Sequence, residues 1–171
     1  MGTCGALQPH LSLGDLVVAR ESICLDGASR ALGGRERRPA DPRSHLISGS
    51  VGDPVDLRSV ADPGLTDALR SAAPHAHSGT IVSVDLFYED VRLPEAAADA
   101  LAVEMEAATL FALGSCAEIP IACVLAVSDT FDASGARTHI DDHTLLAAAE
   151  SMGGAATSAL SANPSRGRAG A

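Results

Sequence analysis

Residues 101–129 read LAVEMEAATLFALGSCAEIPIACVLAVSD, and this stretch decides the fold class. Its hydrophobic pattern predicts a strand of about four residues, a helix of about a dozen and a second strand of about seven, which is the size of one parallel βαβ unit. The second strand, residues 121–127, is apolar at every position, as expected of a strand covered on both faces. We therefore predict a buried parallel strand here.

Acidic residues follow both predicted strands. Glu104 and Glu106 flank Met105 where the first strand ends, and Ser128 and Asp129 follow the second. Because open α/β sheets bind ligands at the carboxyl ends of parallel strands, these acids are expected to converge on one edge of the sheet. A purely structural interpretation stays open, since acids in the first turn of a helix suit its dipole and Ser-Asp is a common start for a turn or a helix cap.

The composition favours one α/β domain and argues against several partners. Of the 171 residues 46% are apolar but only 2% aromatic, so the core must be built from small aliphatic side chains. A net charge of −10 without a basic stripe argues against a nucleic acid or an anionic membrane as partner. Without a signal peptide or an apolar run long enough for a membrane helix, the expected location is the cytoplasm.

Cysteine and histidine spacing predicts no metal site, and the fingerprints of dinucleotide and P-loop sites are missing, so no cofactor is expected. Cys116 and Cys123 are expected to be buried free thiols. Outside the central unit, residues 2–7 read as a glycine-rich loop, 16–19 and 80–84 as strands, 65–73 and 142–160 as helices, and 33–64 and 130–141 as loops.

Three segments together resemble the nucleoside phosphorylase family, which includes hexameric bacterial purine nucleoside phosphorylases, uridine phosphorylases and related nucleosidases. The first is VEMEAATLFALG (103–114) followed by an apolar strand and VSD (127–129). The second is GTCGAL (2–7) with LSLGDLVVAR (11–20), and the third is SVDLFY (83–88). The resemblance implies a three-layer α/β/α fold, with a mostly parallel twisted central sheet flanked by helices.

The resemblance also implies roles in binding the sugar, the base and phosphate. Glu106 would accept hydrogen bonds from the ribose hydroxyls, and Met105 would give the sugar an apolar surface. Thr3 would contact inorganic phosphate, a co-substrate. Phe87 would stack on the nucleobase; Phe131, another ring that follows an apolar strand, has a position that suits stacking on a planar ligand.

Asp129 is the catalytic residue that the resemblance implies, as a general acid toward a purine nitrogen, with Ser128 beside it in the base site. An aspartate has an ordinary pKa of about 3.9, so this role requires a raised pKa or a proton shared with the base. Arg137 and Glu104 are further candidates. Arg137 is the nearest arginine after Asp129, eight positions on, and its role is left open.

The implied reaction is phosphorolysis of a purine (deoxy)ribonucleoside to free base and (deoxy)ribose 1-phosphate. Uridine phosphorolysis ranks second, because uridine phosphorylases read uracil with a Gln and an Arg shortly after the stacking Phe, whereas this chain has no Gln there and Arg92 is out of register. Hydrolysis by a nucleosidase ranks third. A non-catalytic nucleoside-binding remnant or partner subunit is a further alternative.

Domain boundaries and assembly follow from the same resemblance. Residues 1–160 are expected to form one nucleoside phosphorylase-like domain with a loop insertion near 43–61, and residues 161–171, which lack apolar anchors, a disordered tail. Compared with the family, the chain is expected to lack an N-terminal portion, including the first strands and a glycine-rich phosphate loop. A homo-oligomer, hexameric by resemblance, is expected.

Overall fold

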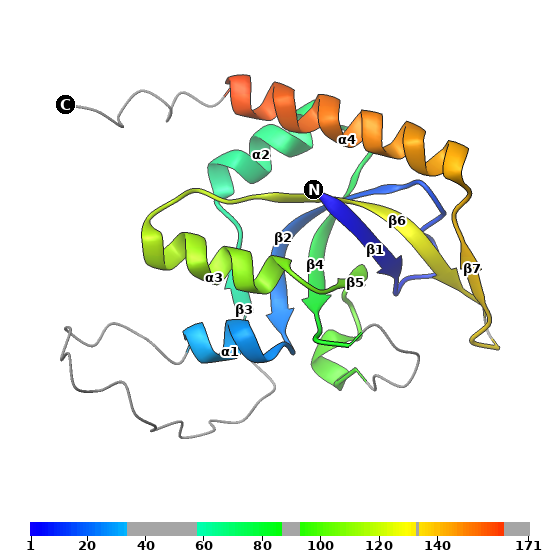
Figure 1. Ribbon diagram of the computed structural model, residues 1–171, viewed down its shortest axis with the longest axis horizontal. Helices are drawn as coiled ribbons and strands as arrows, with labels where there is room; N and C mark the ends of the chain where they lie inside the picture. The colour runs from blue at the N-terminus through cyan, green and yellow to red at the C-terminus, as the bar shows by residue number, and fades with distance from the viewer. Residues whose placement is uncertain (34–57, 87–92, 133, 163–171) are drawn as a thin grey trace.

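The computed structural model describes residues 1–33, 58–86, 93–132 and 134–162. Within these residues the strands are β1 (Gly2–Ala6), β2 (Leu16–Cys24), β3 (Arg58–Val60), β4 (His77–Ser83), β5 (Ala102–Glu104), β6 (Cys123–Phe131) and β7 (Arg137–His139). The helices are α1 (Gly27–Gly33), α2 (Pro63–Ala72), α3 (Ala107–Ala117) and α4 (Asp142–Ala162), with one 3₁₀ turn at Glu95–Ala97. Figure 1 shows the strands gathered at the centre, with α2 and α4 on one side and α1 and α3 on another.

The strands form one sheet in the order β3-β2-β4-β5-β1-β6-β7, and a further pairing of β2 with β6 closes the five central strands into a barrel-like sheet. The pairs β2–β4, β4–β5 and β1–β6 are parallel. The pairs β1–β5, β2–β6, β2–β3 and β6–β7 are antiparallel. The prediction of an α/β fold with helices around a central sheet is confirmed, whereas the prediction that this sheet is mostly parallel is wrong: the sheet is mixed and curls closed.

The opposite directions of β5 and β6 result from the position of β1, which lies between these two strands. It runs antiparallel to β5 and parallel to β6, so the two strands that α3 connects run in opposite directions. The prediction of a parallel βαβ unit over residues 101–129 is thus right about the elements and wrong about their relative direction. Glycine-rich sequence disfavours strands locally, and β1 forms because it has a pairing partner on each side.

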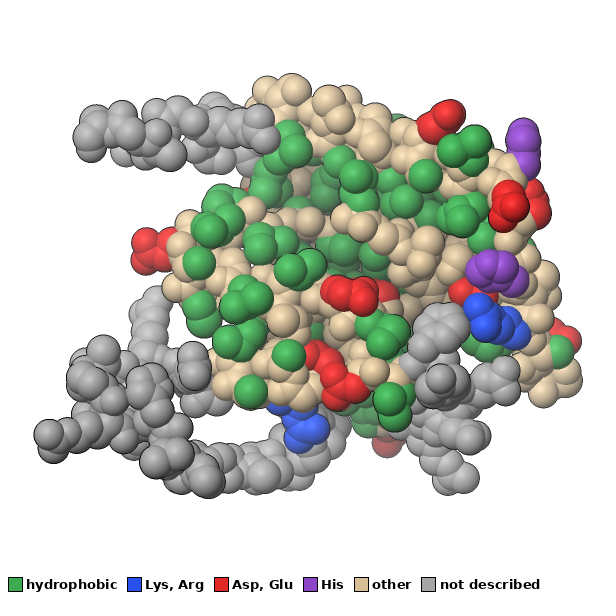
Figure 2. Space-filling view, viewed as in Figure 1, with side chains coloured by type: hydrophobic (Ala, Val, Ile, Leu, Met, Phe, Trp, Pro, Cys, Tyr) green, Lys and Arg blue, Asp and Glu red, His purple; other side chains and the backbone are tan. Residues whose placement is uncertain are grey.

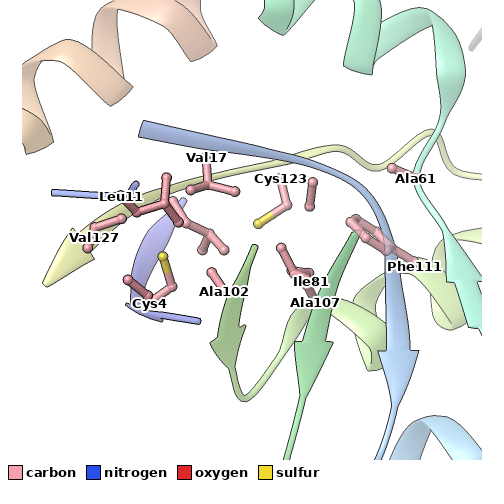
Figure 3. Packing of buried hydrophobic residues seen from close by; sticks show 13 residues of the cluster. Cys4, Leu11, Val17, Ala61, Ile81, Ala102, Ala107, Phe111, Cys123 and Val127 are labelled. Carbon is pink, nitrogen blue, oxygen red and sulfur yellow. The ribbon is translucent and has the colours of Figure 1, made fainter. Parts of the chain in front are cut away.

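The apolar run of β6 is covered on both faces, as predicted. Leu125 and Val127 contribute to a cluster inside the barrel, whereas Val124 and Ala126 face a second cluster with Met152 of α4. This alternation follows from the two-residue period of a strand. The barrel cluster, seen in Figure 3, consists of Cys4, Ala6, Leu11, Val17, Ala19, Ala61, Ile81, Ala102, Ala107, Phe111, Cys123, Leu125 and Val127.

Several segments expected to be loops contain regular structure. Residues 2–6 form β1, and the hairpin strand β7 lies within residues 130–141. In addition, β2 extends beyond the predicted strand 16–19 to Cys24 and is followed by α1. The predicted insertion near 43–61 falls outside the described residues up to residue 57, and β3 occupies its end. The predicted tail lies outside them from residue 163, while Ser161 and Ala162 belong to α4.

Two further predictions concern side chains and membranes. Cys123 is buried, as expected, but Cys116 near the end of α3 is exposed, so that prediction is wrong. Cys116 lies on the solvent side of α3, whose inward side holds Phe111 and Gly114.

None of the described helices has the length and apolarity that a membrane span requires.

Candidate functional site

A pocket of about 450 Å³ lies where the ends of β1, β5 and β6 meet. Its polar side is lined by Thr3, Glu104, Glu106, Ser128, Asp129 and Arg137, and its apolar wall by Leu7, Val84, Leu86, Leu93, Val103, Met105 and Phe131. Figure 2 shows a basic side chain and a histidine grouped with acidic side chains at the β6–β7 end of the molecule. The acids that follow the two predicted strands therefore do converge on one pocket.

Asp129 is the most firmly held of these acids. It is 3% exposed, and its Oδ1 accepts hydrogen bonds from Nε of Arg137 at 2.6 Å and from Nδ1 of His139 at 2.8 Å. Its Oδ2 accepts one from Oγ of Ser128 at 2.7 Å. Burial by itself raises the pKa of Asp129, but the hydrogen bonds from Arg137, Ser128 and His139 outweigh burial and hold the pKa below its ordinary value. The first route to a general acid, a raised pKa, is thus absent from the free site.

The two donors on β7 reach Asp129 because β6 and β7 form an antiparallel hairpin. His139 lies opposite Asp129 and Arg137 opposite Phe131, so both donors stand on the side of the strand pair that carries Asp129. Arg137, whose role the sequence leaves open, therefore contacts Asp129. His139 is not among the site residues predicted from the sequence. The alternation in Arg-Thr-His at 137–139 is nevertheless the pattern that places two side chains on one face of a strand.

The hairpin turn is encoded by Asp132 and Gly135. Oδ1 of Asp132 accepts hydrogen bonds from the backbone N–H groups of Ser134 at 2.8 Å and Ala136 at 2.9 Å. Gly135 has a φ of 82°, a backbone conformation that glycine adopts without strain. An aspartate that bonds the backbone two residues on is a common turn former, and here it sets the register that aligns His139 with Asp129.

Glu104 is engaged in the fold. It is 6% exposed; its Oε2 accepts hydrogen bonds from the backbone N–H groups of Glu106 at 2.9 Å and Ala107 at 2.7 Å, and its Oε1 accepts one from Ser83. Burial raises the pKa of Glu104 in spite of these bonds. Glu104 therefore caps the start of α3, which agrees with the structural interpretation of the acids in this stretch.

Glu106 differs from Glu104 although the two residues line the same pocket. Glu106 is exposed, and no hydrogen bond to its carboxylate is seen within the described residues. It occupies the N-cap position of α3 without a capping bond from its side chain. Because Glu104 caps α3, the carboxylate of Glu106 is left accessible to a ligand.

The start of the chain contributes a strand to the site instead of a loop. Thr3 lies in β1 opposite Ala126, is exposed and lines the pocket. A Cβ on Gly5 would come within 3.3 Å of Cγ1 of Val103 and 3.6 Å of Cε2 of Phe131. A glycine at this position therefore lets β1 pack closely beside Phe131.

Two aromatic residues were considered from the sequence for stacking on a base. Phe87 lies outside the described residues. Phe131, which is 44% exposed, lines the pocket two residues after Asp129 on the same strand. Because side chains two residues apart share one face of a strand, the ring lies on the same side as the Asp129 carboxylate.

Comparison with known proteins decides the family. Residues 1–161 match the family model described as the Phosphorylase superfamily. The chain belongs to this superfamily. The resemblance seen in the sequence is thereby confirmed.

Individual relatives of this superfamily member are longer than the chain. It is 37% identical over 115 residues to a guanosine phosphorylase of Halorubrum lacusprofundi, covering 66% of this chain and 41% of that protein. It is 35% identical over 92 residues to a uridine phosphorylase of Salmonella typhimurium, covering 52% of this chain and 28% of the relative. The chain thus spans less than half the length of these two relatives.

A solved structure of the P. knowlesi homolog of P. falciparum PNP superposes with a TM-score of 0.64 at 22% identity, covering 94% of this chain and 61% of that one. At this identity the superposition bears on the fold alone. It places this superfamily member among nucleoside phosphorylase-like folds, with a mixed sheet and helices around it. The structure brings together eight of the residues singled out in the sequence: Thr3, Glu104, Met105, Glu106, Ser128, Asp129, Phe131 and Arg137.

Proposed function

We propose that this chain carries the nucleoside site of a nucleoside phosphorylase, which uses phosphate to release a free base and a pentose 1-phosphate. The observation that carries the proposal is the pocket itself, in which an anchored carboxylate, Asp129, and an accessible one, Glu106, stand on a polar side that faces an apolar wall. Its volume of about 450 Å³ lies within the range of small-molecule sites. A nucleoside has a matching character, with a planar base and a polar sugar.

Glu106 and Met105 suit the sugar end of such a ligand. The accessible carboxylate of Glu106 is able to accept hydrogen bonds from the ribose hydroxyls, and these bonds are strengthened by its charge. As the bond from C1′ to the base breaks, the sugar gains positive charge, which a nearby carboxylate stabilises. Met105 is half-buried and lines the same pocket, where its thioether gives the sugar an apolar contact.

Asp129 suits the base end. Cleavage leaves the electron pair of the glycosidic bond on the base, while a phosphate oxygen forms the new bond to C1′. A proton on the base nitrogen neutralises that charge. Because the lowered pKa leaves Asp129 ionised in the free site, this proton is taken up from solvent when the base binds and is then shared between Asp129 and the base nitrogen. Asp129 then acts as general acid only in the complex, a contribution typically worth about 10²–10⁴ in rate.

We propose a purine nucleoside as the preferred substrate, because Asp129 is aligned toward the pocket by Arg137 and Ser128. The guanosine phosphorylase relative supports this choice. Uridine is the second candidate, supported by the uridine phosphorylase relative. Both substrates place a planar base beside Phe131.

The proposed site has few groups that are suited to binding phosphate. Thr3 supplies a hydroxyl, and Arg137 is the one Arg or Lys among the described residues that line the pocket. Hydrolysis by water and nucleoside binding without turnover therefore remain the alternatives that an experiment must separate. A homo-oligomer and a cytoplasmic location also remain predictions.

The test is release of free base from inosine, guanosine, adenosine and uridine by the purified chain, with and without phosphate. We expect phosphate-dependent purine release that falls at least about a hundredfold in Asp129→Asn, as loss of a general acid predicts. Asp67→Asn, on the exposed face of α2, is the matched control and should be fully active.

Each other outcome identifies one alternative. Release from uridine alone would favour the second substrate, and release without phosphate would indicate a nucleosidase. Binding of a nucleoside without release would indicate a remnant. Full activity of Asp129→Asn would contradict the role of Asp129.

A further inference from the structure

The two oxygens of the Asp129 carboxylate have different surroundings. Oδ1 accepts hydrogen bonds from both Arg137 and His139, whereas the hydrogen bond seen to Oδ2 within the described residues comes from Ser128. The Ser128 hydroxyl also lies 3.3 Å from the backbone oxygen of Cys4, so it has a second acceptor to which it is able to turn. Oδ2 is therefore the oxygen that a ligand reaches with the least loss of existing hydrogen bonds.

Arg137 and His139 hold Oδ1 in different ways. An arginine stays protonated at any physiological pH, so Arg137 keeps its ability to donate to Oδ1 throughout that range. A histidine donates from Nδ1 only as the Nδ1–H tautomer or as the imidazolium. The 2.8 Å contact with Oδ1 therefore requires a proton on Nδ1 of His139.

His139 also connects a buried group with solvent. Its side chain is 61% exposed, while that of Asp129 is 4% exposed. Among the described residues, Asp129 on β6 is the titratable group that the ring contacts, and Arg137 shares the same carboxylate oxygen. Next along the chain come Asp141, Asp142 and His143. The imidazole of His139 thus contacts both solvent and a buried carboxylate.

We propose that His139 is a positioning residue for Asp129: together with Arg137 it fixes Oδ1, so that Oδ2 faces the base. The charge state of the imidazole also changes the net charge of the groups beside the departing base. The inference rests on the proposed phosphorylase function. With His139 charged, the group of Asp129, Arg137 and His139 carries a net charge of +1, since each contributes one unit, and this stabilises the negative charge that builds up on the departing base before the shared proton neutralises it. With His139 neutral the net charge is zero.

The test compares two substitutions at His139. In Asn, the side-chain amide donates near the place of Nδ1 but does not titrate, whereas Ala removes the donor. We expect His139→Ala to lower kcat about tenfold, the fold-change of one hydrogen bond to a charged group. His139→Asn should recover most of kcat above neutral pH and lose the increase that the wild-type protein shows as the imidazole becomes charged. His143→Asn, exposed at the start of α4, should keep the wild-type profile.

A second readout does not depend on catalysis. Nitrogen chemical shifts of the His139 ring should show a proton on Nδ1, and Asp129→Asn should change them. If the wild-type chain releases base and His139→Asn and His139→Ala both keep its kcat and pH profile, the inference is wrong while the proposed function stands. If the chain releases no base, the proposed function fails, and ring shifts unchanged by Asp129→Asn would overturn the contact itself.

Discussion

Replacing Glu104 by Ala is expected to loosen the start of α3, because three donors meet this one carboxylate. Two of them are the backbone N–H groups of Glu106 and Ala107, and the third is the hydroxyl of Ser83. The Ser83 hydroxyl keeps a neighbour in Ser22, whose Oγ is 2.8 Å away. Only the two backbone N–H groups therefore lose their acceptor.

The loss in the free energy of unfolding depends on how well water replaces the carboxylate as the acceptor for these two N–H groups. An unsatisfied buried donor costs about 1–3 kcal/mol, and this applies in full to Ala107, which is 1% exposed. The N–H of Glu106 is only partly buried and has access to water from the pocket. Because burial disfavours the ionised form of Glu104, its removal also returns some free energy. We expect the free energy of unfolding to fall by about 2 kcal/mol, or about 4–8 °C in Tm for a chain of this size.

Urea and thermal unfolding measure the effect, and Glu104→Gln is the matched control. The Gln oxygen is able to accept from both N–H groups and its amide to donate to Ser83, so we expect less than half of the loss seen with Ala. An unchanged unfolding midpoint for Glu104→Ala would refute the capping argument. Equal losses for Ala and Gln would show that charge, and not hydrogen bonding, stabilises this helix start.

Three other predictions concern acid stability, packing and thiol chemistry. The pKa of Asp129 is lower in the folded chain than its ordinary value of 3.8, so the ionised carboxylate stabilises the fold above pH 3.8. This stabilisation is lost as the pH falls through the pKa of the folded state. The difference in urea stability between the wild-type chain and Asp129→Asn should therefore shrink on acidification. Gly114→Ala would place a Cβ 2.7 Å from a backbone oxygen and should lower Tm by several degrees. A thiol reagent should modify Cys116 in the native protein; Cys4 and Cys123, whose pKa values burial raises to about 12 and about 11, should react only after unfolding.

The elements of the central stretch were predictable because their signals are local. A run of seven apolar residues at 121–127 has to be buried, and β6 is buried on both faces. The acids after the two strands were predicted to meet at one edge, and they line one pocket. This held although β5 and β6 run in opposite directions, because Gly5 of β1 pairs with Val103 on one side and with Asp129 on the other, so the two strands carry their acids to the same part of β1.

Strand direction and the closing of the sheet were not predictable, because they depend on pairing between distant segments. Nothing within residues 2–6 indicates a strand, since two of the five are glycine. Gly5 becomes suitable only beside Val103 and Phe131, which leave little room for a side chain. The β2–β6 pairing likewise joins residues more than 100 positions apart.

The three carboxylates of the pocket show what the structure adds to the sequence. By pattern alone Glu104, Glu106 and Asp129 look alike, since each stands at the end of a predicted strand and each has both a structural and a functional interpretation; the family resemblance is what separates their roles. In the fold the charge of Glu104 meets the N–H groups of α3, and that of Asp129 meets Arg137. Only Glu106 has a carboxylate for which the described residues supply no donor. An accessible anion suits sugar hydroxyls and a cationic sugar, whereas an anchored one suits a base that must be held in a fixed orientation. The division of roles therefore follows from which donors the fold brings to each acid.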